Sequence, residues 1–283
     1  MRAAKRIAWG LLALLLTVAL ALALLFGTAA GSRWLLGMLP GVEIEDFTGR
    51  LGGAWQAERL TWRQDGQRVE VQAPRFAWSP ACLLRLTLCL ERLQAERLEL
   101  GFPPGEEPDD AGPFRLPSLR LPLALELGEV RIGAIRLNGA PLLDDAELRA
   151  SWTAAGLRIE RLQLRQGSLA LDLQGSLRPE GDWPMELAGS LDLQAAGAQS
   201  WRLELQANGD LQGTLELSGR SSGYLAGTLA GELQPLAEHL QAKLEIRADG
   251  FRAAAALPDP LVLNAVQLTG EGDLAAGYRV KGR

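Results

Sequence analysis

The segment Ser168–Leu177, with the sequence SLALDLQGSL, alternates leucine with polar residues along most of its length. Leu169 and Leu171 occupy one set of alternate positions, whereas Asp172 and Gln174 occupy the other. A period of two is typical of a β-strand that has one apolar face and one solvated face. The segment therefore predicts a strand.

The same alternation returns between Leu187 and Leu233, with Asp, Gln, Glu or Arg in the gaps. A slip of one residue in strand register would exchange each leucine for a polar or charged neighbour, so we expect a well-defined register. One face of the predicted sheet should thus be lined by leucine. The residues expected to line it are Leu169, Leu171, Leu173, Leu187, Leu191, Leu193, Leu203, Leu205, Leu215, Leu217 and Leu229.

A shorter repeat, L-x-G-x-L, lies inside this pattern and places glycine on the leucine face. It occurs at 173–177, 187–191, 211–215, 225–229 and 229–233. Glycine inside a strand marks a bend, a bulge or a close approach of another backbone. We interpret the repeat as a sheet that curls with its leucine face inside; the alternative is that these are ordinary glycines near turns.

Composition excludes several functional classes. Hydrophobic residues make up 47% of the 283 residues but aromatic residues only 6%, so leucine and alanine dominate. The net charge is −5 and the basic residues are scattered singly, so the sequence shows no basic cluster of the kind that binds nucleic acid. Two cysteines and one histidine, His239, leave little for metal or redox chemistry. We therefore expect no catalytic residues, no metal and no cofactor, and we expect His239 to be exposed.

The N-terminus predicts a membrane anchor. Arg2, Lys5 and Arg6 precede a stretch without charge that runs from 7 to 32. A helix over Ile7–Phe26 would be about 30 Å long, which matches the hydrocarbon core of a bilayer. A cleaved signal peptide is the alternative, although its apolar core usually has only about 7–15 residues. Residues 1–32 are expected to be a single-pass signal anchor whose basic end stays in the cytoplasm.

The rest of the chain divides into three predicted parts. Residues 33–100 form an N-terminal β segment, which begins with an interfacial turn at Ser32–Met38 and contains a hairpin turn at Asp65-Gly66 and a helical turn after Ser79. Residues 101–122 are rich in Pro and Gly and predict a linker loop. Residues 123–283 form the repeating β-strand groove, which we expect to be truncated at its C-terminal end.

The two cysteines, Cys82 and Cys89, would both meet an oxidising compartment in an exported chain. A disulfide requires their Cα atoms to lie within about 7 Å of each other. We predict this disulfide; the alternative is that both are small buried apolar residues.

Several motifs resemble the N-terminal part of the TamB family, the inner-membrane subunit of a translocation and assembly module. They are GSRWLL after the anchor, DFTGRLGG, SPACLLRLTLCL, LPSLRLP and GDWPMELAGSLDL, and the resemblance covers essentially the whole chain. It implies an AsmA-like periplasmic bridge that carries phospholipid between the inner and outer membranes. It also implies a link to outer-membrane biogenesis and protein secretion with the barrel protein TamA, through a C-terminal region that we do not expect here.

The expected fold is mainly β, with an N-terminal transmembrane helix followed by an elongated, curled antiparallel sheet that has an apolar interior. The physics of such a sheet favours a lipid conduit. An uncovered leucine face must meet another sheet, itself or lipid. Two acyl chains with about 30 methylenes would cost on the order of 25 kcal/mol to expose to water, so their movement needs an apolar lining. The alternative function is a scaffold or chaperone that adds strands at its open edge.

Overall fold

The computed structural model describes residues 14, 16–18, 20–103, 116–193, 200–223, 225–237, 240–252, 262–263, 266–273 and 277–282. The described chain is mainly β. It forms two compact units, one made of Met1–Pro103 with Gly128–Pro141 and the other of Pro104–Leu127 with Leu142–Arg283. The chain passes between the units after Pro103, again within β8 (Ala124–Leu137) and a third time within β9 (Ala140–Leu143). Most of the predicted linker and His239 lie outside the described residues.

The first unit contains a helix pair and a small antiparallel sheet. β4 pairs with β1 and β5, β7 pairs with β5 and β6, and β3 pairs with β2 and β6. The elements are helix Leu16–Gly27, α2 (Ala29–Gly37), β1 (Val42–Glu45), β2 (Thr48–Gly49), β3 (Trp55–Gln56), β4 (Arg59–Gln64), β5 (Gln67–Gln72), β6 (Arg75–Ser79), the 3-10 helix Pro80–Arg85 and β7 (Thr87–Gly101).

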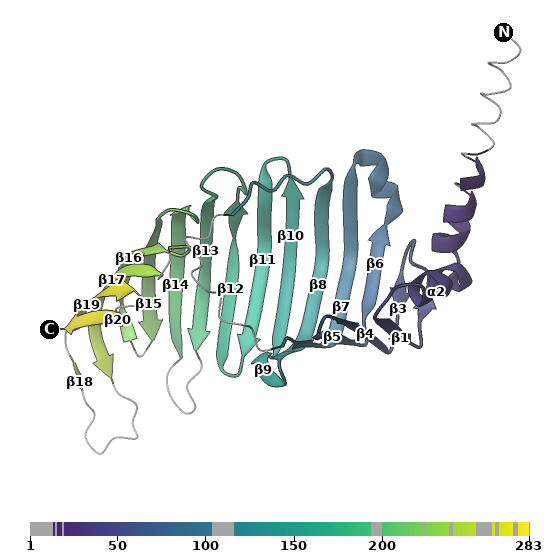
Figure 1. Cartoon of the computed structure of the whole chain (residues 1–283). Coiled ribbons are helices and arrows are strands. Elements are labelled where there is room, and N and C mark those ends of the chain that lie inside the picture. The colour runs from purple at the N-terminus through teal and green to yellow at the C-terminus, as the bar shows by residue number, and fades with distance from the viewer. Residues whose placement is uncertain are drawn as a thin grey trace, which may run out of the picture. The chain divides into compact units, whose positions relative to one another are not determined.

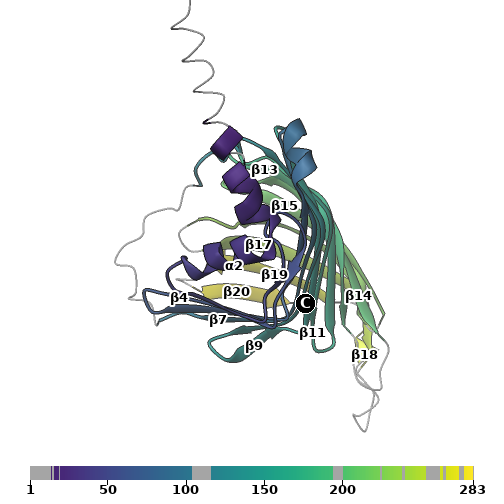
Figure 2. The ribbon, with the colours of Figure 1, turned by 90° about the vertical axis from the view of Figure 1, so that its right-hand side faces the viewer.

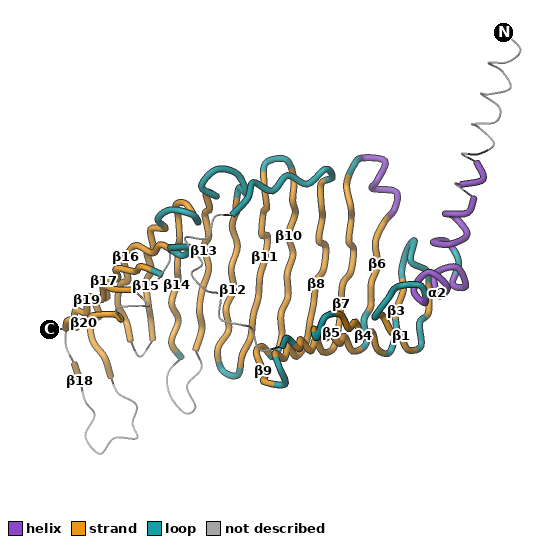
Figure 3. Tube along the Cα trace, viewed as in Figure 1, coloured by secondary structure: helices purple, strands orange, loops and turns teal. Residues whose placement is uncertain are grey.

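The second unit is an open antiparallel sheet in which β10 to β17 each pair with the next strand along the chain. β17 then pairs with both β18 and β19, and β19 with β20. The strand direction turns progressively from β12 to β17 (Figures 1 and 3), as expected from the natural twist of a sheet. The strands are β10 (Asp145–Thr153), β11 (Gly156–Gln166), β12 (Leu169–Leu177), β13 (Pro184–Leu193), β14 (Trp201–Asp210), β15 (Leu215–Gly223), β16 (Leu225–Gln234), β17 (Gln241–Arg252), β18 (Val262–Leu263), β19 (Val266–Asp273) and β20 (Gly277–Gly282).

The start of the predicted anchor, with Arg2, Lys5 and Arg6, lies outside the described residues, and the described apolar segment bends between Gly27 and Ala29. Within the described residues, no single helix has the length and hydropathy to span a bilayer, whereas Leu16–Gly27 and α2 together do, with an 88° bend between them. The bend follows Thr28, whose hydroxyl donates to the carbonyl of Leu24 and accepts the N–H of Gly31, so it caps the second helix. The expected turn at Ser32–Met38 is thus part of helix α2.

Ser32, which is fully buried, connects the bend to the loop between β2 and β3. The Ser32 hydroxyl accepts the N–H of Leu51 at 3.0 Å and donates to the carbonyl of Leu25 at 3.4 Å. The N–H of Gly52 donates to the carbonyl of Phe26 at 2.7 Å. Helix α2 is consequently held beside β1 (Figure 1), and Figure 2 labels the same helix in the view turned by 90°.

Local turn chemistry in this unit follows the sequence. Asp65 and Gly66 form the predicted two-residue hairpin turn between β4 and β5, both with positive φ (51° and 78°), as a type I′ turn requires. The predicted helical turn after Ser79 is the 3-10 helix Pro80–Arg85, which ends at Leu86 in the left-handed region. Both predictions are confirmed.

The 3-10 helix brings Cys82 to the start of β7, where the structure joins it to Cys89 with a Cα–Cα distance of 6.0 Å. Both side chains are buried. Replacing both cysteines with serine should lower the free energy of unfolding by about 2–3 kcal/mol, because the bridge restricts the unfolded chain. Alkylation in denaturant without reductant should leave both sulfurs unlabelled in the oxidised protein; labelling of both would show that they are free thiols.

A charge network crosses the polar face of the first unit and centres on the buried Glu70. Arg68 lies 2.6 Å and Arg59 3.4 Å from the Glu70 carboxylate, and Arg59 also lies 2.9 Å from Glu45. The hydrogen bond from Arg68 lowers the pKa of Glu70 despite the opposing effect of burial. The ionised carboxylate is therefore the form that the folded state favours.

Substituting Glu70→Gln should lower the free energy of unfolding by about 1–2 kcal/mol at pH 7, a figure reduced by the exposure of the arginines. Because the folded-state pKa is lowered, this stabilisation is complete above the unfolded pKa of about 4.3. It is lost as the pH falls through the lowered value. Urea titrations of both proteins over this range should show the difference shrinking toward acid; a difference independent of pH would contradict the ionised role.

Candidate functional site

The strand register of the second unit gathers the predicted leucines on one face. Residues directly opposite each other in an antiparallel pair point to the same side of the sheet. Leu171 lies opposite Leu191, which in turn lies opposite Leu203. The same pairing relations place all eleven predicted residues on this side, which we name the leucine face. They come together across five strands, β12 to β16.

The leucine face carries no charged residue at any paired position from β12 to β16. One transverse row reads Leu173, Gly189, Leu205, Gly219, Leu229, and the parallel rows contain Leu, Ala, Met, Trp and Gly with Ser221 as the polar member. The face extends beyond the predicted residues, because Leu162 and Leu164 of β11 and Ile246 of β17 pair with its members. The alternation of apolar and polar residues around each of these three positions is the sequence signal that could have placed them on the predicted leucine face.

Leucines on this face are neither buried in a closed core nor fully exposed. Leu215 is 5% exposed, while the other ten predicted residues are half-buried. Neighbouring leucines within one sheet layer therefore shield one another in part. Covering an apolar surface of this kind with further apolar material lowers the free energy, because it removes the surface from water.

The glycines of the L-x-G-x-L repeat make room for leucines of the neighbouring strand. A Cβ atom at Gly189 would collide with the carbonyl oxygen of Asp172 and lie 2.5 Å from the Leu173 Cδ2. At Gly231 it would likewise collide with a backbone oxygen and lie 2.6 Å from the Leu244 Cδ2. The glycines thus mark a close approach of strands, whereas the curl of the sheet that we infer from the repeat stays a prediction.

The repeat at 211–215 does not lie within a strand, so the prediction is wrong at this position. Leu211 and Gly213 lie in the turn before β15, which begins at Leu215. The N–H of Leu211 donates to the carbonyl of Trp183 and that of Gly213 to the carbonyl of Asp210. These bonds to a neighbouring loop and within the turn end the strand, although leucine spacing continues through it.

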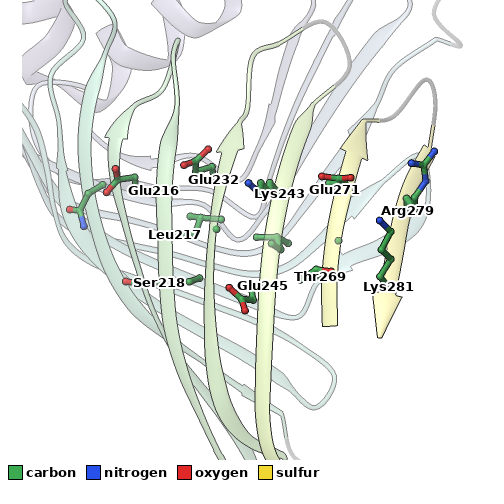
Figure 4. Close-up of a pocket in the computed structure, with 15 residues that line it drawn as sticks. Glu216, Leu217, Ser218, Glu232, Lys243, Glu245, Thr269, Glu271, Arg279 and Lys281 are labelled. Carbon is green, nitrogen blue, oxygen red and sulfur yellow. The ribbon is translucent and has the colours of Figure 1, made fainter. Parts of the chain in front are cut away.

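The opposite side of the sheet is polar and forms ion pairs across strands. Arg202 lies 3.6 Å from Asp192, and Gln163 donates to Asp172 at 2.7 Å. A hollow of about 510 Å³ lies on this polar side near the C-terminal strands (Figure 4).

Around this hollow, Glu216 lies opposite Glu232, a pair of like charge, but the next three pairs along the register are opposite in sign. Glu232 lies opposite Lys243, Lys243 opposite Glu271, and Glu271 opposite Arg279. Opposite charges directly across a strand pair stabilise the pairing, so these side chains have a structural role without a ligand. The described part of the chain contains no group of three His, Cys, Asp or Glu residues that could hold a metal ion.

Comparison with known proteins identifies a family model that matches the chain over two ranges. The family described as TamB, N-terminal domain, matches residues 17–138 and 111–283. No curated protein and no solved structure matches the chain. The family is inner-membrane anchored with a periplasmic body, generally associates with TamA and membranes, and is a transport and assembly module rather than a known enzyme family. Because the two matches span nearly all of the sequence, the chain belongs to the TamB family.

Proposed function

We propose that this chain is an inner-membrane-anchored periplasmic bridge protein that carries phospholipid on its leucine face. The observation that carries the proposal is the uncharged apolar face that runs across β12 to β16. An acyl chain that moves along such a face exchanges one apolar neighbour for another. It meets no charged side chain on the way. Membership of the TamB family supports this function independently.

The proposal includes the placement of the chain. Arg2, Lys5 and Arg6 stay in the cytoplasm, the apolar N-terminal segment anchors the chain in the inner membrane, and the sheet lies in the periplasm. We propose TamA as the outer-membrane partner, because the family generally associates with it. We propose that the sheet curls with the leucine face on its inner side, so that the sheet shields the lipid tails from the aqueous periplasm.

Phospholipid bound to the purified chain tests this function against the scaffold alternative. Native mass spectrometry from detergent should show at least one phospholipid for each folded chain, because the leucine face needs an apolar cover. A strand-adding scaffold has no need of bound lipid. A folded, lipid-free chain under conditions that preserve lipid on a known lipid carrier would contradict the proposed function.

A further inference from the structure

A hollow of about 480 Å³ lies between helix α2 and the first strands of the first unit. Its apolar walls are Leu36 of α2, Val42 and Ile44 of β1, and Phe47. Phe47 is only 6% exposed and packs against Trp55, with 5.9 Å between the ring centroids. The volume falls in the range of about 300–1,000 Å³ that small-molecule sites occupy.

Two opposite charges border this hollow. Arg33 enters its lining from α2 and Asp46 from the turn after β1. Both residues are exposed, and neither side chain has a hydrogen bond or ion pair with any described residue. The hollow thus offers one free cation and one free anion beside an apolar wall. This combination complements a ligand that carries a phosphate, an ammonium group and an apolar body.

The surroundings of the hollow are suited to contact with a bilayer. Apolar side chains remain exposed on the helix before the bend. Trp34 on α2 is 57% exposed, and Met38, the residue at the C-terminal cap of α2, is 63% exposed. Tryptophan is typical of the membrane–water interface, and an apolar surface on a helix beside an anchor favours that position. The buried Ser32 and its bonds to the neighbouring loop hold α2 in place, so the hollow needs no rearrangement to form.

The apolar wall of the hollow continues onto the sheet of the same unit. Ile44 lies opposite Leu60, Leu60 opposite Val71, and Val71 opposite Leu98. A parallel row runs from Val42 through strands β4, β5 and β7. An acyl chain that enters at β1 therefore has an apolar path across four strands.

We propose that this hollow binds the headgroup region of a zwitterionic aminophospholipid, with the phosphate at Arg33 and the ammonium at Asp46. The glycerol and upper acyl chains lie against Val42 and Ile44. The hollow is thereby the site where the chain takes its lipid from the membrane interface. This inference rests on the proposed function, since it assumes that the sheet carries phospholipid.

A photo-crosslinking amino acid at Leu36 tests the site in the full chain reconstituted into vesicles. Vesicles of phosphatidylethanolamine and phosphatidylglycerol should give an ethanolamine lipid adduct. Arg33→Gln and Asp46→Asn should each reduce it about fivefold, whereas Arg75→Gln, which removes an exposed charge outside the hollow, should leave it unchanged. Equal capture of both lipids, or an adduct insensitive to the two hollow variants, would overturn the proposal.

A second crosslinker at Leu191 separates failure of this site from failure of the proposed function. Capture at position 191 without capture at position 36 overturns the hollow as a lipid site and leaves the leucine face intact. Capture at neither position overturns both. Capture at both, with the predicted dependence on Arg33 and Asp46 at position 36, supports both.

Discussion

Substitution of Gly189→Ala is expected to lower the free energy of unfolding by about 3 kcal/mol, a large effect for one methyl group. The added Cβ would collide with the carbonyl oxygen of Asp172 on β12 and press on the side chain of Leu173. A backbone oxygen in a paired strand cannot move aside without breaking the pairing. Urea unfolding of the detergent-solubilised protein, followed by circular dichroism, measures the loss.

Gly213→Ala provides a matched control, because the same substitution is made in the turn rather than on the leucine face. A Cβ at this position would meet only the Asp210 side chain, at 3.3 Å, and the backbone oxygen at 3.8 Å. We expect its free energy of unfolding to stay within about 0.5 kcal/mol of the wild type. Equal stability of the two variants would show that β12 and β13 lie farther apart at Gly189 than the structure describes.

Leu191→Asp is expected to reduce bound phospholipid at least tenfold. The new carboxylate would lie between Leu171 and Leu203 on the leucine face. Covering an ionised group with acyl chains costs several kcal/mol, and about 1.4 kcal/mol already corresponds to a factor of ten in binding. Lipid extraction and quantification per chain provide the measurement.

Asp192→Leu is the control for the opposite side of the same strand. It removes an ion pair with Arg202, whose separation of 3.6 Å and exposed position make it worth less than about 1 kcal/mol. Bound phospholipid should stay near the wild-type amount in this variant. Equal lipid loss in both variants would instead indicate damage to the sheet as a whole.

The strands were predictable because their signal is local. Alternation of leucine and polar residues sets which side chains share a face, and the antiparallel order of β12 to β16 then aligns these faces. The turn at Asp65-Gly66 was predictable for the same reason, since both residues tolerate positive φ. Leu211 shows the limit of this reasoning, because its spacing continues the pattern while its N–H bonds to Trp183.

The hollow beside α2 was not predictable, because it depends on contacts between distant segments. Leu51 lies 19 residues after Ser32 in the sequence, and the contact between them holds the helix bend against β1. The single local signal was Thr28, a capping residue within an apolar run. It is equally consistent with a cleavage site, which is how a small polar residue after an apolar segment is often interpreted.

Photo-crosslinking at positions 191 and 192 tests the central claim most directly, because these neighbouring residues point to opposite sides of β13. The chain would carry the crosslinker at one position or the other, in membranes or in vesicles of defined phospholipid. We predict a phospholipid adduct at position 191 and none at position 192. Equal capture at both positions, or capture at neither, would contradict a lipid-carrying leucine face and favour a sheet whose apolar side is covered by protein.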